Sequence, residues 1–103
     1  MNPQPKNKPI RSKHYLEWVR KLYCVNCYRC PGAIDVVPHH VRMGHTGGMG
    51  TKPGDNHSVP LCVDCHNELH QIGERRFWQG NAKDPHAIAS KMWAIWTKKP
   101  WEG

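Results

Sequence analysis

Four histidines have spacings along the chain that could bring their side chains together at one metal site. His66 and His70 are four residues apart in a segment with helical character, so their side chains share one helix face about a turn apart. His39 and His40 are adjacent near the end of an expected strand. Neutral imidazole binds divalent metal ions and accepts protons from water near neutral pH. Phosphodiester hydrolysis uses both functions, because a water must be activated and charge on the phosphate must be stabilised.

Cysteines supply a second set of candidate ligands. Four of the five cysteines form two C-x-x-C pairs that are separated by a long insert: Cys24, Cys27, Cys62 and Cys65. Two such pairs typically place four thiolates around one structural zinc ion. Cys30 extends the first pair to C-x-x-C-x-x-C, so Cys27 with Cys30 is an alternative pair. We favour Cys24 with Cys27. The knuckle, the turn that would hold the metal, is then the C-x-x-C segment from Cys24 to Cys27, and Pro31 and Gly32 lie beyond it.

The two ligand sets are connected along the chain. Cys65 immediately precedes His66, and Cys27 comes shortly before the strand that carries His39 and His40. A zinc ion bound by the cysteines would therefore hold the paired histidines near the histidines of the helix. Adjacent residues on a regular strand point to opposite faces. His39 and His40 can therefore flank one phosphate only where the strand ends or bulges.

Composition predicts a small, basic protein with one domain. The chain has 103 residues, of which 38% are hydrophobic, and its formal net charge is +7. Domains with so little apolar material commonly rely on a metal or a disulfide, and a basic surface favours anionic partners such as nucleic acid. The sequence shows neither the apolar core of a signal peptide nor a run long enough to span a membrane. We expect a cytoplasmic protein without a membrane partner, whose cysteine pairs bind zinc.

Helices and strands must position these ligands. The polar, proline-rich residues 1–12 predict a flexible basic arm, and residues 13–103 are expected to form one domain. The expected elements are a helix over 14–23, a strand over 34–41, a Gly-rich connection over 42–56, a returning strand over 57–62, a helix over 64–73, a short helical piece over 74–79 and a helix over about 84–98. Ser12 and Asp84 are expected to cap the first and last helices.

The order of these motifs resembles a known family. The pair H-H at 39–40, the returning strand V-P-L-C and the segment C-x-x-C-H-x-x-x-H ending at His70 resemble the HNH endonucleases, which have a ββα-metal fold. The segments G-H-T-G-G-M-G-T-K-P, V-P-L-C and N-E-L-H are also similar to phage-borne recombination-enhancement nucleases and their prophage relatives. The resemblance covers about residues 22–72. It implies an α+β fold in which a small ββα-metal (HNH) core is stapled by a four-cysteine zinc site and flanked by helices.

The resemblance also implies roles for individual residues. Three histidines would hold one catalytic divalent ion: His39, His66 and His70. His40 would be the general base. The middle Asn of the HNH motif falls on Asn56 or on His57, because the usual spacing to the following cysteine points to His57, one residue past Asn56. The donor set leaves the identity of the ion open among Mg, Mn, Ni and Zn.

These features predict a metal-dependent endonuclease that cuts DNA with low sequence specificity. Candidate phosphate contacts are four basic residues: Arg42, Lys52, Arg75 and Arg76. Three tryptophans are expected to pack on helix faces inside the domain: Trp18, Trp93 and Trp96. The sequence leaves open single- or double-stranded DNA, the oligomeric state, and a recombinase or phage-packaging partner in a bacterial or phage-infected cell.

Two other interpretations fit the same residues. The chain could be a zinc-finger-like module that binds nucleic acid without catalysis, which predicts one zinc ion per chain. It could also be a small structural adaptor whose histidines bind a second structural zinc, which predicts a closed coordination sphere with no position left for substrate.

Overall fold

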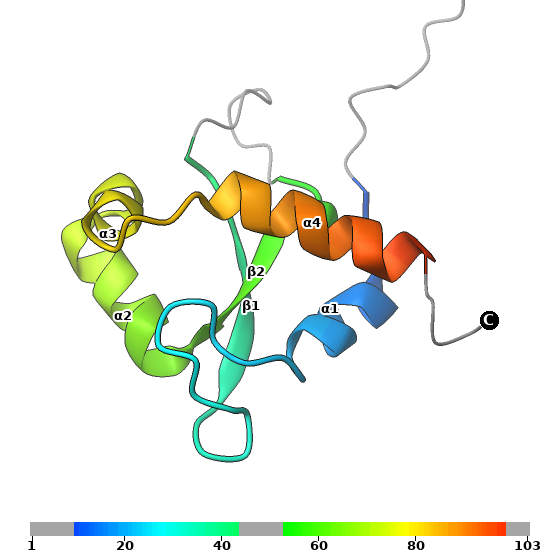
Figure 1. Cartoon of the computed structure of the whole chain (residues 1–103), viewed down its shortest axis with the longest axis horizontal. Helices are drawn as coiled ribbons and strands as arrows, with labels where there is room; N and C mark the ends of the chain where they lie inside the picture. Colours follow the sequence, from blue (N-terminus) through cyan, green and yellow to red (C-terminus); the bar gives the residue numbers. More distant parts are fainter. Residues whose placement is uncertain (1–9, 44–52, 99–103) are drawn as a thin grey trace, which may run out of the picture.

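The computed structural model describes residues 10–43 and 53–98. Within these ranges the chain forms a two-stranded sheet surrounded by helices (Figure 1). The elements are α1 (Lys13–Val19), β1 (Val36–His40), the short 3-10 helix η1 (Asp55–His57), β2 (Ser58–Cys62), α2 (Val63–Ile72), α3 (Glu74–Gly80) and α4 (Pro85–Lys98). This order of elements confirms the expected α+β class.

The two strands form an antiparallel pair that leads directly into α2. Val36 pairs with Cys62 at one end of the sheet, and His40 pairs with Ser58 at the other. Every residue of β2 is buried, because this strand pairs with β1 and is also contacted by three helices, α1, α2 and α4. His40 is the last residue of β1, so the paired histidines do lie where the strand ends.

Local hydrogen bonds explain where the first and last helices begin. The Ser12 hydroxyl accepts a hydrogen bond from a backbone N–H in the first turn of α1, and the Asp84 carboxylate does the same for α4. Both caps were expected from the sequence. α1 ends at Val19, earlier than the predicted helix, because the Lys21 N–H bonds only three residues back and tightens the chain into a turn.

Two apolar clusters form the core. The larger cluster lies between the sheet, α2 and α3, and its largest buried side chains include Leu61, Phe77 and Trp78. The smaller cluster joins α1 to α4 around Tyr15, whose ring centre lies 4.9 Å from that of Trp93 and 5.7 Å from that of Trp96. Trp18, Trp93 and Trp96 are partly buried and pack against this cluster, as expected, and the ring centres of Trp18 and Trp96 are 5.4 Å apart. In Figure 1, α4 crosses in front of the two strands.

The stretch directly before α1 is hydrogen-bonded to η1. The backbone carbonyl of Ile10 accepts a 2.8 Å hydrogen bond from the Asp55 N–H, and the Ser12 N–H donates to the Asp55 carboxylate at 2.7 Å. These bonds attach residues 10–12, the last three of the predicted flexible arm, to η1. Residues 1–9 lie outside the described residues.

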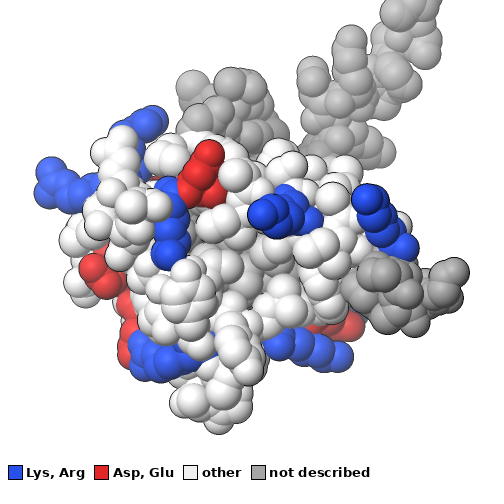
Figure 2. Space-filling model, in the orientation of Figure 1, with Lys and Arg blue, Asp and Glu red and all other residues white. Residues whose placement is uncertain are grey.

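Charged side chains are distributed over the surface. Figure 2 shows Lys and Arg at separate places on one face, with Asp and Glu near some of them, rather than in a single basic block. The net charge of +7 is therefore not concentrated in one patch on this face. None of the helices in the described ranges combines the length and the apolar character needed to cross a membrane.

Candidate metal centre and histidine pocket

Four cysteine side chains gather where β2 passes into α2. Their sulfur atoms all lie within 4.8 Å of one another: Cys24, Cys27, Cys62 and Cys65. Zn–S bonds of about 2.3 Å in a tetrahedron require sulfurs roughly 3.8 Å apart, and the Sγ atoms of Cys27 and Cys62 are 3.6 Å apart. The structure thus confirms the predicted cysteine set as a cluster that could hold zinc. Cys30 lies outside the cluster, so the alternative pair is not used.

Nitrogen donors surround this cysteine cluster. The Arg29 Nε atom lies 3.2 Å from the Cys27 sulfur, and its Nη2 atom lies 3.5 Å from the Cys62 sulfur. The Asn26 side-chain amide donates to the Cys65 sulfur at 3.4 Å. Burial raises the pKa of Cys27, but hydrogen bonds, led by the one from Arg29, lower it to about 6. Zinc binds the thiolate form, and these contacts favour that form at Cys27, whereas burial raises the pKa of Cys62 and of Cys65.

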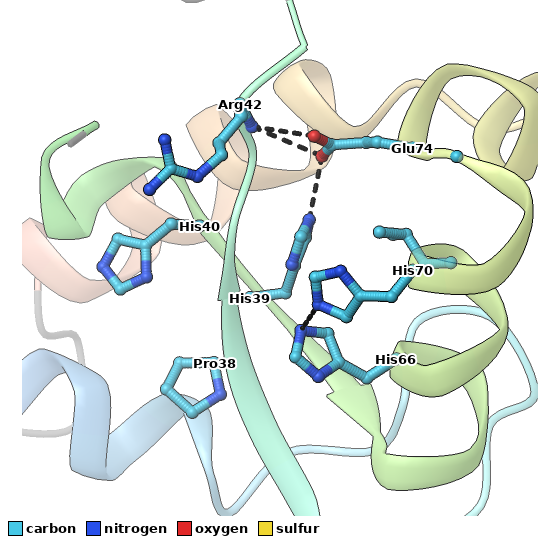
Figure 3. Close-up of a pocket in the computed structure, with 9 residues that line it drawn as sticks. Pro38, His39, His40, Arg42, His66, His70 and Glu74 are labelled. Carbon is cyan, nitrogen blue, oxygen red and sulfur yellow. Dashed lines mark hydrogen bonds and ion pairs between the residues drawn. The ribbon is translucent and has the colours of Figure 1, made fainter. Parts of the chain in front are cut away.

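The histidines predicted to bind the catalytic ion line one pocket. This histidine pocket has a volume of about 450 Å³ and lies between β1, α2 and the start of α3 (Figure 3). The Nε2 atoms of His66 and His70 are 3.1 Å apart. Two imidazole nitrogens bound to one ion are separated by roughly 3 to 3.4 Å, so this pair has the spacing of a chelate. The ring centre of His39 lies 5.2 Å from that of His66 and 6.3 Å from that of His70.

The histidine set is gathered less tightly than the cysteine set. Within the described ranges, the cysteines are the one group of three or more candidate ligands whose donor atoms all lie within 4.8 Å. Burial, and then the neighbouring charges of His39 and His70, lower the pKa of His66. This keeps His66 in the neutral form that metal binding requires.

A carboxylate that the sequence analysis did not single out holds His39 in place. Glu74, the first residue of α3, accepts a 2.8 Å hydrogen bond from the Nε2 atom of His39 and 3.1 Å bonds from the backbone N–H groups of Arg42 and Met43. Burial raises the pKa of Glu74, but the bonds from His39 and then Arg42 lower it, so Glu74 is an ionised acceptor. Carboxylates in such positions orient metal-binding imidazoles. In the sequence, Glu74 is only an acidic residue in a first helix turn, which is a common feature and no distinctive signal.

His40 lies on the other side of β1 from His39, as Figure 3 shows. Its Nε2 atom is 2.8 Å from Oδ1 of Asp55, a second residue that the sequence analysis missed. Asp55 also accepts from the backbone N–H of Ser12 at 2.7 Å and from Arg11 at 3.4 Å. Burial raises the pKa of Asp55, but the bond from His40 and then the one from Ser12 lower it. An ionised carboxylate that accepts from Nε2 leaves the Nδ1 atom of His40 able to take up a proton.

The two candidates for the middle HNH position line a different cavity. Asn56 and His57 lie at a hollow of about 150 Å³ that is completed by residues of α4. The Asn56 side chain folds over Gly54, where a Cβ atom would lie only 2.5 Å from its Oδ1 atom. The structure therefore does not bring Asn56 or His57 into the histidine pocket. Their neighbour Asp55 is the η1 residue that reaches His40.

The predicted phosphate contacts are placed unequally around the histidine pocket. Arg42 lines the pocket, and its guanidinium extends over the side of β1 that carries His40 (Figure 3). Arg75 and Arg76 lie on α3 and directly follow Glu74, which lines the pocket. Lys52 lies outside the described residues.

Comparisons with known proteins identify relatives without a described function. Residues 2–88 match the family described as "Protein of unknown function (DUF968)". The "Uncharacterized protein YdfU" of Escherichia coli (strain K12) is 42% identical over 67 residues, which cover 64% of this chain and 18% of that protein. The chain therefore corresponds to less than a fifth of the length of this curated relative. No solved structure matches the chain.

Proposed function

We propose, from the premise that the chain belongs to the DUF968 family of unknown function, that it is a metal-dependent endonuclease of the HNH type that hydrolyses phosphodiester bonds in DNA. One observation carries the proposal. Histidines from two elements line the same pocket: His39 and His40 come from β1, and His66 and His70 come from α2. The order strand, strand, helix, with the cysteine cluster at the junction of β2 and α2, is the arrangement that the HNH resemblance implies.

Three imidazoles form the donor set for the proposed catalytic ion: His39, His66 and His70. A divalent ion held there would stabilise negative charge on the phosphate and on the departing oxygen. The protein's own contribution is orientation. α2 places two of the rings one turn apart, and the Glu74 carboxylate fixes the ring of His39. The pocket volume of about 450 Å³ leaves room for a phosphate group beside these residues.

His40 is the proposed general base. Its Nδ1 atom would take a proton from the attacking water, while Asp55 holds the ring by Nε2 and stabilises the imidazolium that forms. The Arg42 guanidinium lies on the same side of β1 and offers positive charge to the phosphate (Figure 3). In this scheme the ion-binding histidines and the base act from opposite sides of the end of β1.

A second candidate function is a zinc-containing module that binds nucleic acid without cutting it. The tight cysteine cluster favours this candidate, because a structural zinc explains that cluster without any catalytic ion. The two candidates differ in what the histidine pocket does. The endonuclease needs a second, exchangeable ion at the pocket, whereas the binding module does not.

A plasmid-nicking assay with the zinc-loaded chain tests the proposal. Wild type and a His66→Ala/His70→Ala double variant are compared with Mg, Mn, Ni or no added ion. His14→Ala, on the exposed face of α1, is the control. We expect nicking by wild type and control, and in the double variant a loss greater than the roughly 10- to 100-fold that removal of an outer-shell partner costs. Wild-type protein that is folded, loaded with zinc and able to bind DNA, but that cuts with none of these ions, would favour the binding module.

A further inference from the structure

A hollow beside the cysteine knuckle is lined by two exposed tyrosines. Tyr23 and Tyr28 are each 62% exposed. Both line a cavity of about 340 Å³, whose walls also include Lys83 and Ile88. This tyrosine hollow shares no lining residue with the histidine pocket. Large aromatic side chains gathered at one open hollow indicate a binding surface, because burying them in a complex is favourable.

Tyr28 adopts a backbone conformation that disfavours its own side chain. Its φ angle is 64°, in the left-handed region. The knuckle imposes this angle, because the Tyr28 N–H bonds the Cys24 carbonyl at 2.9 Å and the Cys24 N–H bonds the Arg29 carbonyl at 3.1 Å. Glycine adopts such an angle freely, whereas a bulky aromatic residue does so only against strain. A tyrosine at this position therefore points to a use for its ring.

Lys83 adds positive charge to the hollow without covering the ring of Tyr28. Its Nζ atom lies 2.9 Å from the Tyr28 hydroxyl but 5.1 Å from the ring centre. The ammonium group is therefore at the hydroxyl edge of the ring, which agrees with the high exposure of the side chain. An accessible aromatic ring beside a cationic group is the combination with which proteins hold single strands, since bases stack on the ring and phosphates pair with the cation.

We propose that the tyrosine hollow binds an unpaired nucleotide of a single-stranded nucleic acid. A base stacks on Tyr28 and Tyr23, and a neighbouring phosphate pairs with Lys83. The choice of nucleic acid as partner rests on the proposed function and on the net charge of +7. Paired bases in a duplex are already stacked on one another and do not present their faces. The hollow therefore gives the protein a preference for single strands over intact duplex.

Fluorescence anisotropy with a labelled oligothymidylate tests the site. The whole zinc-loaded chain is used without added divalent ions, so that binding is measured apart from cleavage. Tyr28→Gly is the most informative variant, because glycine suits the φ angle of 64°. Its thermal midpoint should equal or exceed that of wild type, while its affinity for the oligonucleotide falls roughly tenfold or more. Tyr28→Phe keeps the ring and should keep most of the affinity.

Two further variants complete the design. Lys83→Gln should weaken binding. It should also reduce, by about one, the slope of the logarithm of the binding constant against the logarithm of the salt concentration. Ile95→Ala changes an exposed apolar residue of α4 outside the hollow and should bind as wild type does. Should Tyr28→Gly lose zinc, Tyr23→Ser removes a ring outside the C-x-x-C turn and must show the same loss of affinity.

The outcomes separate this inference from the proposed nuclease. Equal affinity of wild type, Tyr28→Gly and Tyr23→Ser would overturn the site, and the nuclease proposal would stand on its own assay. Tyrosine-dependent binding by a protein that cuts nothing would support the site and count against the nuclease. Wild-type protein that binds no oligothymidylate would overturn the site and leave the hollow to a protein partner.

Discussion

The Nε2 atom of His40 and the Oδ1 atom of Asp55 lie 2.8 Å apart, although the two residues are separated by 15 positions in the sequence. The other oxygen of the same carboxylate accepts the backbone N–H of Ser12, which caps α1. One buried side chain therefore connects the proposed general base to the start of the first helix. Both the position of the His40 ring and the stability of the fold should therefore depend on Asp55.

Replacement of Asp55 by Ala should reduce both stability and cleavage. The change leaves the backbone N–H of Ser12 and the ring of His40 without their acceptor, which should cost about 2–3 kcal/mol of unfolding free energy. Asp55→Asn keeps the shape and should cost less. Urea unfolding measures the first effect and single-turnover cleavage the second. Asp35→Ala, at an exposed position, is the control. Equal stabilities of Asp55→Ala and wild type would contradict this role.

Replacement of Arg29 by Gln should accelerate the loss of zinc. Arg29 donates to sulfurs from both C-x-x-C pairs, and four thiolates around one zinc ion carry an excess of negative charge. We expect zinc affinity to fall by roughly 10-fold or more, in line with other outer-shell contacts. Transfer of zinc to a coloured chelator measures this, with Arg20→Gln at the exposed end of α1 as control. Identical release from both variants would exclude a contribution of Arg29.

Replacement of Gly54 by Ala should destabilise the loop that carries Asp55. The φ angle of Gly54 is −66°, which any residue adopts, so the effect would be steric. A Cβ atom there would lie 2.5 Å from the Asn56 Oδ1 atom and 3.0 Å from the Ile10 nitrogen. Such overpacking costs about 1–3 kcal/mol. Thermal unfolding checks it against Gly32→Ala, where nothing lies within 4 Å of the added carbon. Equal midpoints for both variants would refute the close approach.

Stability should fall at high pH because of Tyr15. Burial raises the pKa of Tyr15 from 10.0 to about 12. Its stabilising effect is therefore complete below pH 10, where the phenol is neutral in both states, and is lost as the pH rises toward 12, because the unfolded chain ionises first. Tyr15→Phe removes this loss. It also deletes a buried hydroxyl that has no hydrogen-bond partner among the described residues.

Urea unfolding of wild type and Tyr15→Phe across this pH range makes the comparison. At pH 7 the variant should be as stable as wild type or more stable, since an unsatisfied buried hydroxyl is unfavourable. The advantage of the variant should then grow above pH 10. Parallel loss of stability by both proteins over that range would show that Tyr15 is not the group responsible.

Short-range patterns in the sequence predicted much of the fold. The helix caps at Ser12 and Asp84 and the two C-x-x-C pairs depend on neighbours within a few positions, and all of them are present in the structure. The prediction that the first helix continues to residue 23 also came from a short-range pattern, and it was wrong. Apolar spacing continued to Tyr23, but that side chain is exposed, because the chain leaves the helix to form the knuckle.

Contacts between distant segments could not be predicted in this way. Glu74 meets His39 across 35 positions, and that meeting depends on how α3 packs against α2, since this places the start of α3 near the end of β1. An acidic residue in a first helix turn has an ordinary local explanation through the helix dipole, so Glu74 gave no distinctive signal. Asp55 likewise stands in a connection where Asp is common in turns. Only the packed fold distinguishes these two carboxylates from other acidic residues.

Single-turnover cleavage of labelled DNA by His40→Ala tests the central claim most directly. The assay uses the metal ion that supports wild-type cutting, and zinc content is measured in parallel to show that the cysteine cluster is intact. Loss of a general base should slow cleavage by about 10²- to 10⁴-fold, while zinc content and folding stay as in wild type. Cleavage by His40→Ala at the wild-type rate would contradict the assignment of His40 and the nuclease site built around it.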